Sequence, residues 1–93
     1  MTEITLESIV KRNDSRVVCT ELDDELIMMD LENGNYIRLN KTGRVIWEQL
    51  ENPIQVEKLV SYLMGQFEVS QKDCTKSIVE FLSTMLRDKM LID

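Results

Sequence analysis

The sequence contains no histidine, one proline, three glycines and two cysteines among its 93 residues. Without histidine, the chain cannot form a Ser/His or Cys/His catalytic pair, and two cysteines alone are too few ligands for a zinc site. The three glycines, Gly34, Gly43 and Gly65, are too far apart to form a phosphate-binding loop. We therefore expect that the chain has no enzymatic activity, holds no metal and needs no cofactor.

Basic residues are also few. Lys and Arg together number 11 and Asp and Glu together number 17, which gives a formal net charge of −6. Affinity for nucleic acid comes mainly from neutralisation of phosphates by Lys and Arg, so this charge argues against a nucleic-acid partner. Residues 1–10 contain no apolar run long enough for export or for a membrane span. We expect a cytoplasmic protein that does not associate with a membrane.

The two cysteines, Cys19 and Cys74, are far apart in the sequence and have apolar neighbours. In a cytoplasmic protein, such residues are more often reduced thiols in the core than partners in a disulfide. A chain of 93 residues can bury about two thirds of the surface that its unfolded form exposes, which is enough for one core without a cross-link. The whole chain, residues 1–93, is therefore predicted to be a single domain.

The pattern of apolar residues changes from strand-like to helix-like near residue 40. Before it, apolar and polar residues alternate in short segments, which predicts three or four antiparallel strands, with residues 1–15 as an N-terminal extension or an extra strand. After it, the helical period predicts helices at about 41–51, 56–67 and 71–88, followed by a short closing strand at 90–92. The predicted fold class is α+β, with the antiparallel sheet followed by a three-helix bundle.

The Asn-Gly pair at 33–34 lies between two alternating apolar segments and is a strong signal for a β-hairpin. A two-residue loop would pair Asp30 with Ile37 and so place a carboxylate on the core face. A three-residue loop would pair Met29 with Ile37 and leave Met28 and Asp30 on the outer face. We favour the three-residue loop, because it keeps the carboxylate out of the core.

In both registers, Ile37 and Leu39 exchange backbone hydrogen bonds with the preceding strand, so the backbone groups of Tyr36 and Arg38 point the other way. These groups form an open strand edge that can accept a peptide by strand addition. A second interpretation is a dimerising adaptor that uses the same edge for self-association. Asn40, directly after the strand, is a good N-cap for the helix at about 41–51.

A series of short motifs runs through the middle of the chain: Glu21-Leu22-Asp23, Leu26-Ile27, Asp30-Leu31, Gly34, Tyr36, Leu39-Asn40, Gly43, Ile46-Trp47 and Leu50. In their order and spacing, these motifs resemble the PqqD-like RiPP recognition elements, and the resemblance extends from about residue 16 to 92. The sequence departs from the family at the start of the second helix, where Pro53-Ile54-Gln55 stands in place of the usual threonine cap. The resemblance implies a winged-helix-like domain that binds the leader segment of a ribosomally made precursor peptide.

A separate chain of this length is similar to the recognition subunits of lasso-peptide systems. This similarity implies a precursor leader peptide as partner, together with a leader peptidase and a cyclase or another modifying enzyme. It also implies that the leader adds antiparallel to the strand at 36–39 and packs its apolar side chains against the helix at about 71–88. The candidate peptide-binding residues are therefore Tyr36, Ile37, Arg38, Leu39, Asn40, Cys74, Ser77, Ile78 and Phe81.

Three of these residues also have a purely structural interpretation. Tyr36 can equally be a surface aromatic residue that covers the hairpin. Ile78 and Phe81 fit the core better than a binding groove, although the two are continuous in so small a domain.

Charge gives a further expectation and an alternative function. Arg38, Lys41 and Lys76 would attract an acidic leader and speed its association. The alternative is a winged-helix DNA-binding regulator, for which the third helix would need to be basic. The charges on that helix cancel, and the chain as a whole is acidic.

Overall fold

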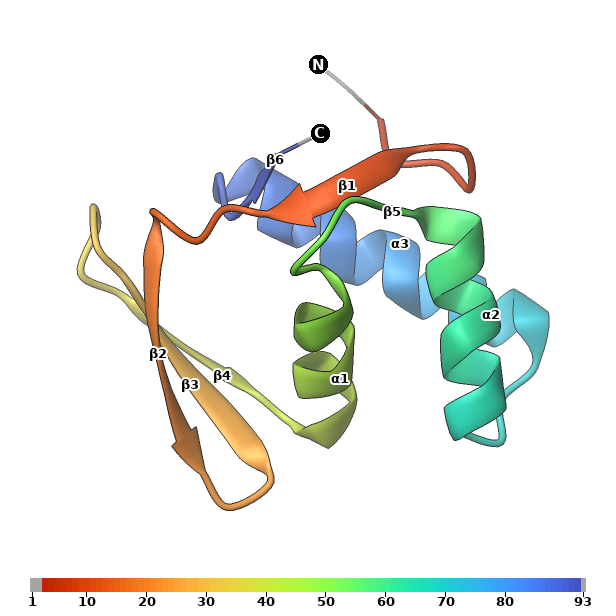
Figure 1. Ribbon diagram of the computed structural model, residues 1–93, viewed down its shortest axis with the longest axis horizontal. Helices are drawn as coiled ribbons and strands as arrows, with labels where there is room; N and C mark the ends of the chain where they lie inside the picture. The colour runs from red at the N-terminus through yellow and green to blue at the C-terminus, as the bar shows by residue number, and fades with distance from the viewer. Residues whose placement is uncertain (1–2, 93) are drawn as a thin grey trace.

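The computed structural model describes residues 3–92, which form six strands and three helices (Figure 1). In chain order the elements are β1 (Ile9–Arg12), β2 (Val17–Leu22), β3 (Glu25–Asp30), β4 (Tyr36–Leu39), α1 (Lys41–Gln49), β5 (Ile54–Gln55), α2 (Val56–Gln66), α3 (Gln71–Arg87) and β6 (Leu91–Ile92). The predicted α+β class is confirmed. The strands, however, form two separate antiparallel sheets of three strands, where the sequence indicated one sheet of three or four.

The first sheet has the order β5–β1–β6 and joins both ends of the chain to the start of α2. β1 pairs with β5 through Ile9 and Val10, and with β6 through Lys11 and Arg12. The predicted closing strand near the C-terminus is therefore present as β6. The N-terminal segment does contribute a strand, β1, but this strand does not pair with β2, β3 or β4, which form the second sheet (the hairpin sheet).

The second sheet has the order β2–β3–β4 and extends to the left of α1 in Figure 1. β3 and β4 pair Met28 with Ile37, so both expected registers are wrong. The loop between β3 and β4 is longer than expected. The N–H of Asp30 donates to the carbonyl of Asn35 at 2.8 Å, so residues 31–34 form the loop. Met28 consequently faces the core and is fully buried, contrary to its predicted place on the outer face.

A hydrogen-bonded ion pair explains why Asp30 can occupy the core face. Its carboxylate is only 2% exposed and accepts hydrogen bonds from Arg16 Nε at 2.8 Å and Nη2 at 3.3 Å. It also accepts from the N–H groups of Glu32 at 3.0 Å and Asn33 at 3.2 Å. Burial of a charge is tolerated when it is paired and hydrogen-bonded, and these contacts meet both conditions. The same contacts hold the β3–β4 loop against the start of β2.

The starts of α1 and α3 follow local capping signals, whereas Gln55 at the start of α2 makes no side-chain capping hydrogen bond. The side chain of Asn40 accepts a hydrogen bond from the N–H of Gly43 at 2.9 Å and caps α1. Ser70 caps α3 in the same way by accepting from the N–H of Asp73 at 3.2 Å. α1 ends at Gln49, slightly before the expected end, while α2 and α3 agree with the prediction to within one residue.

One core fills the space between the hairpin sheet and the helices. α1 packs against β3 and β4, and α2 packs against α3. The fully buried side chains belong to Val10, Met28, Leu50, Val56, Leu59, Ile78, Leu82 and Met90.

The cysteines differ in their environments, although both are free thiols. Cys74 is buried between α2 and α3, as expected, and its thiol donates to the carbonyl of Val60 at 3.8 Å. Cys19 is exposed, so its expected place in the core is wrong. The reason is that Cys19 lies on the edge strand β2 and lines an open hollow between β2 and α1.

Candidate functional site

β4 is an edge strand, and within residues 3–92 no strand pairs with its outer side. The N–H of Asp30 donates to the carbonyl of Asn35, and hydrogen-bonded pairs alternate with non-hydrogen-bonded pairs along an antiparallel ladder. Ile37 and Leu39 therefore bond to β3, and the backbone N–H and C=O groups of Tyr36 and Arg38 point away from it. The structure agrees with the open edge that the sequence indicated, although the register differs.

The opposite edge of the sheet, along β2, is flanked by charged side chains. A hollow of about 180 Å³ lies there between β2 and α1, and Arg12 stacks over the ring of Trp47 at 5.7 Å from its centroid. Charged residues in the lining are Arg12, Asp14, Glu21, Arg44 and Glu48. Charged side chains beside an edge discourage strand addition, so the edge of β4 is the better candidate for a peptide.

The four side chains of β4 alternate between the two faces of the sheet. Leu39 is buried and Ile37 is half-buried on the core side. Tyr36 is 73% exposed on the outer side, and Arg38 is exposed beside it. Arg38 is not a free cation, because its Nε donates to Glu25 Oε1 at 2.8 Å and this hydrogen bond raises the pKa of Arg38. The expectation that Arg38 attracts an acidic leader is thereby weakened.

The end of β4 is joined tightly to the start of α1. A Cβ atom at Gly43 would lie 3.3 Å from Leu39 Cβ, so a glycine lets the helix approach the strand closely. Asn40 is exposed, but its side-chain oxygen is already used as the helix cap. This junction fixes where β4 ends and α1 begins.

The candidate residues on α3 do not form one surface. Cys74 and Ile78 are buried in the core, 4% and 1% exposed, while Ser77 is exposed and Phe81 is half-buried. α3 packs chiefly against α2 and β6, whereas β4 packs chiefly against β3 and α1. Of the four candidates on α3, only Ser77 and Phe81 therefore have side chains that a peptide can reach.

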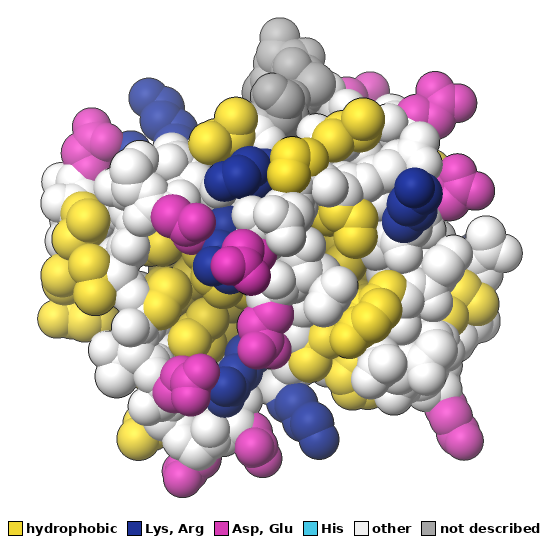
Figure 2. All heavy atoms as spheres, viewed as in Figure 1, with side chains coloured by type: hydrophobic (Ala, Val, Ile, Leu, Met, Phe, Trp, Pro, Cys, Tyr) yellow, Lys and Arg dark blue, Asp and Glu magenta, His cyan; other side chains and the backbone are white. Residues whose placement is uncertain are grey.

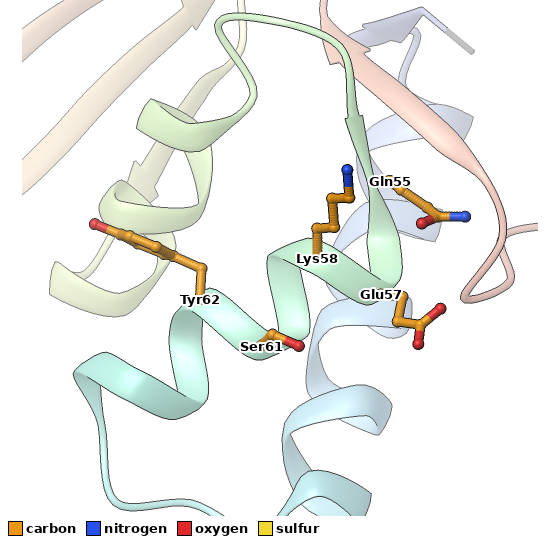
Figure 3. A pocket seen from close by; sticks show the side chains of 5 residues that line it. All are labelled: Gln55, Glu57, Lys58, Ser61 and Tyr62. Atoms are coloured by element: carbon orange, nitrogen blue, oxygen red, sulfur yellow. The ribbon is translucent and has the colours of Figure 1, made fainter.

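Another hollow, of about 540 Å³, lies away from β4. It is open and is lined by side chains from β5 and one side of α2, which Figure 3 shows: Gln55, Glu57, Lys58, Ser61 and Tyr62. None of these residues was a candidate in the sequence. We regard it as a surface depression between side chains of α2.

Two groups with shifted pKa values, Asp30 and Cys74, have structural roles. The Arg16 guanidinium and the N–H groups of the loop lower the pKa of Asp30 from 3.8 to about 2, so its carboxylate is charged at neutral pH. Burial raises the pKa of Cys74, which keeps the thiol protonated and poorly nucleophilic.

Within residues 3–92, no group of three or more His, Cys, Asp or Glu side chains is arranged to hold a metal ion. No helix in the same part of the chain is long and apolar enough to cross a membrane.

Sequence reasoning overlooked two residues next to the candidate site. The register places Val18, Met29 and Tyr36 side by side on the outer face of the sheet, one from each strand. Alternation within β2 and β3 carries this signal, but only the correct register reveals which residues meet.

Comparison with known proteins gives a family and a structural neighbour. The family model described as coenzyme PQQ synthesis protein D (PqqD) matches residues 25–91. Among solved structures, the chain is similar to "TbiB1 in Complex with the TbiA(beta) Leader Peptide", with a TM-score of 0.77 and 27% sequence identity. The match covers 87% of this chain and 93% of that one. No curated protein matches the sequence significantly.

Proposed function

The chain belongs to the PqqD family, and from this we propose that it recognises the leader segment of a ribosomally synthesised precursor peptide. The observation that carries the proposal is the open edge of β4, together with the similarity in fold to a protein whose structure contains a leader peptide. The family match spans β3, β4 and all three helices, so it includes the candidate edge.

The proposed mechanism is strand addition. An extended leader segment pairs antiparallel with β4 and bonds to the outward N–H and C=O groups of Tyr36 and Arg38. Each hydrogen bond contributes about 1 kcal/mol net, so two to four such bonds contribute roughly 2–4 kcal/mol. The remaining affinity must come from burial of leader side chains, which follow the strand period and alternate between the two faces.

The side chains that would contact the leader come from β4 and α3. Tyr36 flanks the leader on the outer face, while Ile37 and Phe81 offer partly buried apolar surface. We retain Ser77 as an exposed contact on α3. Leu39, Cys74 and Ile78 are buried, so in this proposal they belong to the core that supports β4 and α3 and do not touch the leader, and Asn40 holds the end of the strand.

The wider role that we propose is presentation of the bound leader to other proteins, with no catalysis by this chain. The partners are a leader peptidase and a cyclase or other modifying enzyme, acting in the cytoplasm. The family membership supports a winged-helix-like description of the whole chain as one recognition domain. The DNA-binding alternative receives no support from the comparisons.

Titration with a synthetic leader tests the proposal. The peptide is the leader of the precursor encoded beside this chain, and the control is a scrambled peptide of the same composition. We expect saturable binding in the micromolar to nanomolar range, with amide chemical-shift changes concentrated at residues 36–40 and 77–81. Equal binding of the scrambled peptide, or shift changes confined to the hollow on α2, would contradict the proposal.

A further inference from the structure

One pair of charged side chains lies on the outer face of the hairpin sheet, next to the open edge of β4. The pair consists of Glu25 on β3 and Arg38 on β4. The other side chains that the strand pairing places on this face are uncharged: Val18, Thr20, Leu22, Ile27, Met29 and Tyr36. Figure 2 shows hydrophobic side chains gathered on the flank of the molecule that carries the β2–β4 strands. Glu25 and Arg38 are therefore the two charges that a strand added to β4 would meet on this face.

Arg38 keeps free hydrogen-bond donors although it is paired. Its Nε donates to Glu25 Oε1 at 2.8 Å, and its Nη2 donates to the same oxygen. A guanidinium group has five N–H donors, and within residues 3–92 these two bonds leave the Nη1 group of Arg38 without a partner. The Arg38 side chain is 64% exposed, so an incoming carboxylate can reach the free donors.

A leader strand on β4 would bring one of its own side chains next to Arg38. In an antiparallel pair, residues directly opposite each other point their side chains to the same face, with Cβ atoms about 4.5–5.5 Å apart. The leader residue that bonds to the backbone of Arg38 therefore has its side chain on the outer face, beside the guanidinium. The residues before and after it in the leader point to the other face and do not meet Arg38.

The two charges of the pair lie at different distances from that leader residue. Arg38 is on the adjacent strand, about 5 Å away, while Glu25 is one strand further, about 10 Å away. Charges in physiological salt are screened over about 8 Å, so the guanidinium acts on the leader side chain more strongly than the Glu25 carboxylate does. Because the pair is neutral as a whole, its effect is limited to this short range.

We propose that Arg38, partly neutralised by Glu25, selects the charge of one leader side chain, so that a carboxylate binds better than an amine at the leader position opposite Arg38. This inference rests on the proposed function, because it requires a leader strand on β4. It adds a side-chain preference to strand addition, since backbone bonds form with any residue that keeps its N–H. Glu25 limits the preference, so a neutral residue at this position is still accepted.

A charge scan of the leader tests the proposal. The probes are synthetic peptides with the leader sequence of the precursor encoded beside this chain, each with Glu, Gln or Lys at one position. Each peptide is titrated against the wild type, Arg38→Gln and Glu25→Gln. The control variant is Lys58→Gln, which removes one positive charge from an exposed residue on α2. Thermal melts establish that every variant is folded.

In the wild type, Glu should bind about three- to tenfold more tightly than Lys at one leader position, with a smaller difference at the positions beside it. Arg38→Gln should abolish this preference, because the closer charge is removed. Glu25→Gln should enlarge the preference at least about twofold, because the guanidinium is no longer neutralised. Lys58→Gln alters the net charge as much as Arg38→Gln does, yet it should leave the preference unchanged.

Two results would overturn the inference and leave the proposed function standing. One is a leader that binds the wild type and shows the same Glu-to-Lys affinity ratio in Arg38→Gln at every position. The other is an equal loss of preference in Lys58→Gln, which would assign the effect to net charge. Failure of every leader peptide to bind the wild type would instead refute the proposed function.

Discussion

Replacement of Arg38 by proline tests the open edge of β4 at its central donor. Proline removes the outward-pointing backbone N–H and restricts φ to about −65°. The matched control is Arg38→Ala, which also removes the guanidinium and its ion pair with Glu25 but keeps the backbone N–H. The difference between the two variants therefore isolates the backbone donor from the side chain. Proline is tolerated on an edge strand when its nitrogen faces away from the partner strand, as it does at Arg38.

The expected loss of affinity follows from the hydrogen bonds that the leader can make. Removal of the donor eliminates one bond, and the change in φ weakens a neighbouring one, which together cost about 1–2 kcal/mol. Since about 1.4 kcal/mol corresponds to a tenfold change, Arg38→Pro should raise the Kd for the leader roughly 5- to 30-fold. Arg38→Ala should raise it by less than about threefold, because an exposed ion pair contributes little.

A second substitution on the same strand should behave in the opposite way. Ile37 donates its N–H to β3 and is packed against the core, so Ile37→Pro removes a ladder hydrogen bond and a partly buried side chain. The side chain contributes up to about 1.5–3 kcal/mol and the bond about 1 kcal/mol, out of a typical total of roughly 5–15 kcal/mol. Ile37→Pro should therefore lose most of its stability.

Thermal melts and calorimetric titrations on the three variants provide the measurements. Folded Arg38→Pro protein that binds the leader as tightly as Arg38→Ala would refute strand addition at this edge. Stable, cooperatively unfolding Ile37→Pro protein would show that the assignment of inward and outward backbone groups is wrong.

Three further predictions concern stability and accessibility. Because Arg16 lowers the pKa of Asp30 from 3.8 to about 2, this carboxylate stabilises the folded state fully above about pH 4, and the contribution should disappear as the pH falls toward 2. Urea midpoints of the wild type and Asp30→Asn should therefore converge between pH 4 and pH 2, and a constant difference would show that charge is not involved. Asn40→Ala should lower the free energy of unfolding by about 1 kcal/mol through loss of the α1 cap, as measured by urea unfolding, and no loss would mean that the cap is dispensable. At alkaline pH a thiol reagent should label Cys19 in the folded protein and Cys74 only after denaturation, because Cys19 is exposed and Cys74 is buried; rapid labelling of both would contradict the packing of α3 on α2.

Local signals in the sequence were sufficient for the starts of α1 and α3 and for the open edge of β4. Asn40 and Ser70 cap α1 and α3 through contacts that span three residues, so the sequence near each helix start determines where it begins. The edge of β4 was identified although the register was wrong. Side-chain direction and N–H direction alternate together along a strand, so any pairing that turns Ile37 and Leu39 inward leaves the backbone groups of Tyr36 and Arg38 outward.

The sequence by itself therefore determined the order of the three helices and the hairpin strands, the caps of α1 and α3, and which residues of β4 present an edge, because these properties depend on neighbours within a few positions. It did not indicate the short strand β5. The tertiary structure alone decided the register, since Arg16, in the turn before β2, neutralises the Asp30 carboxylate and makes its place on the core face acceptable. It also decided that Cys19 is exposed, that Cys74 and Ile78 belong to the core, and that Val18 meets Met29 and Tyr36 on an uncovered face. Each of these outcomes depends on which distant segment lies opposite, and the apolar pattern of a single segment carries no information about its partner.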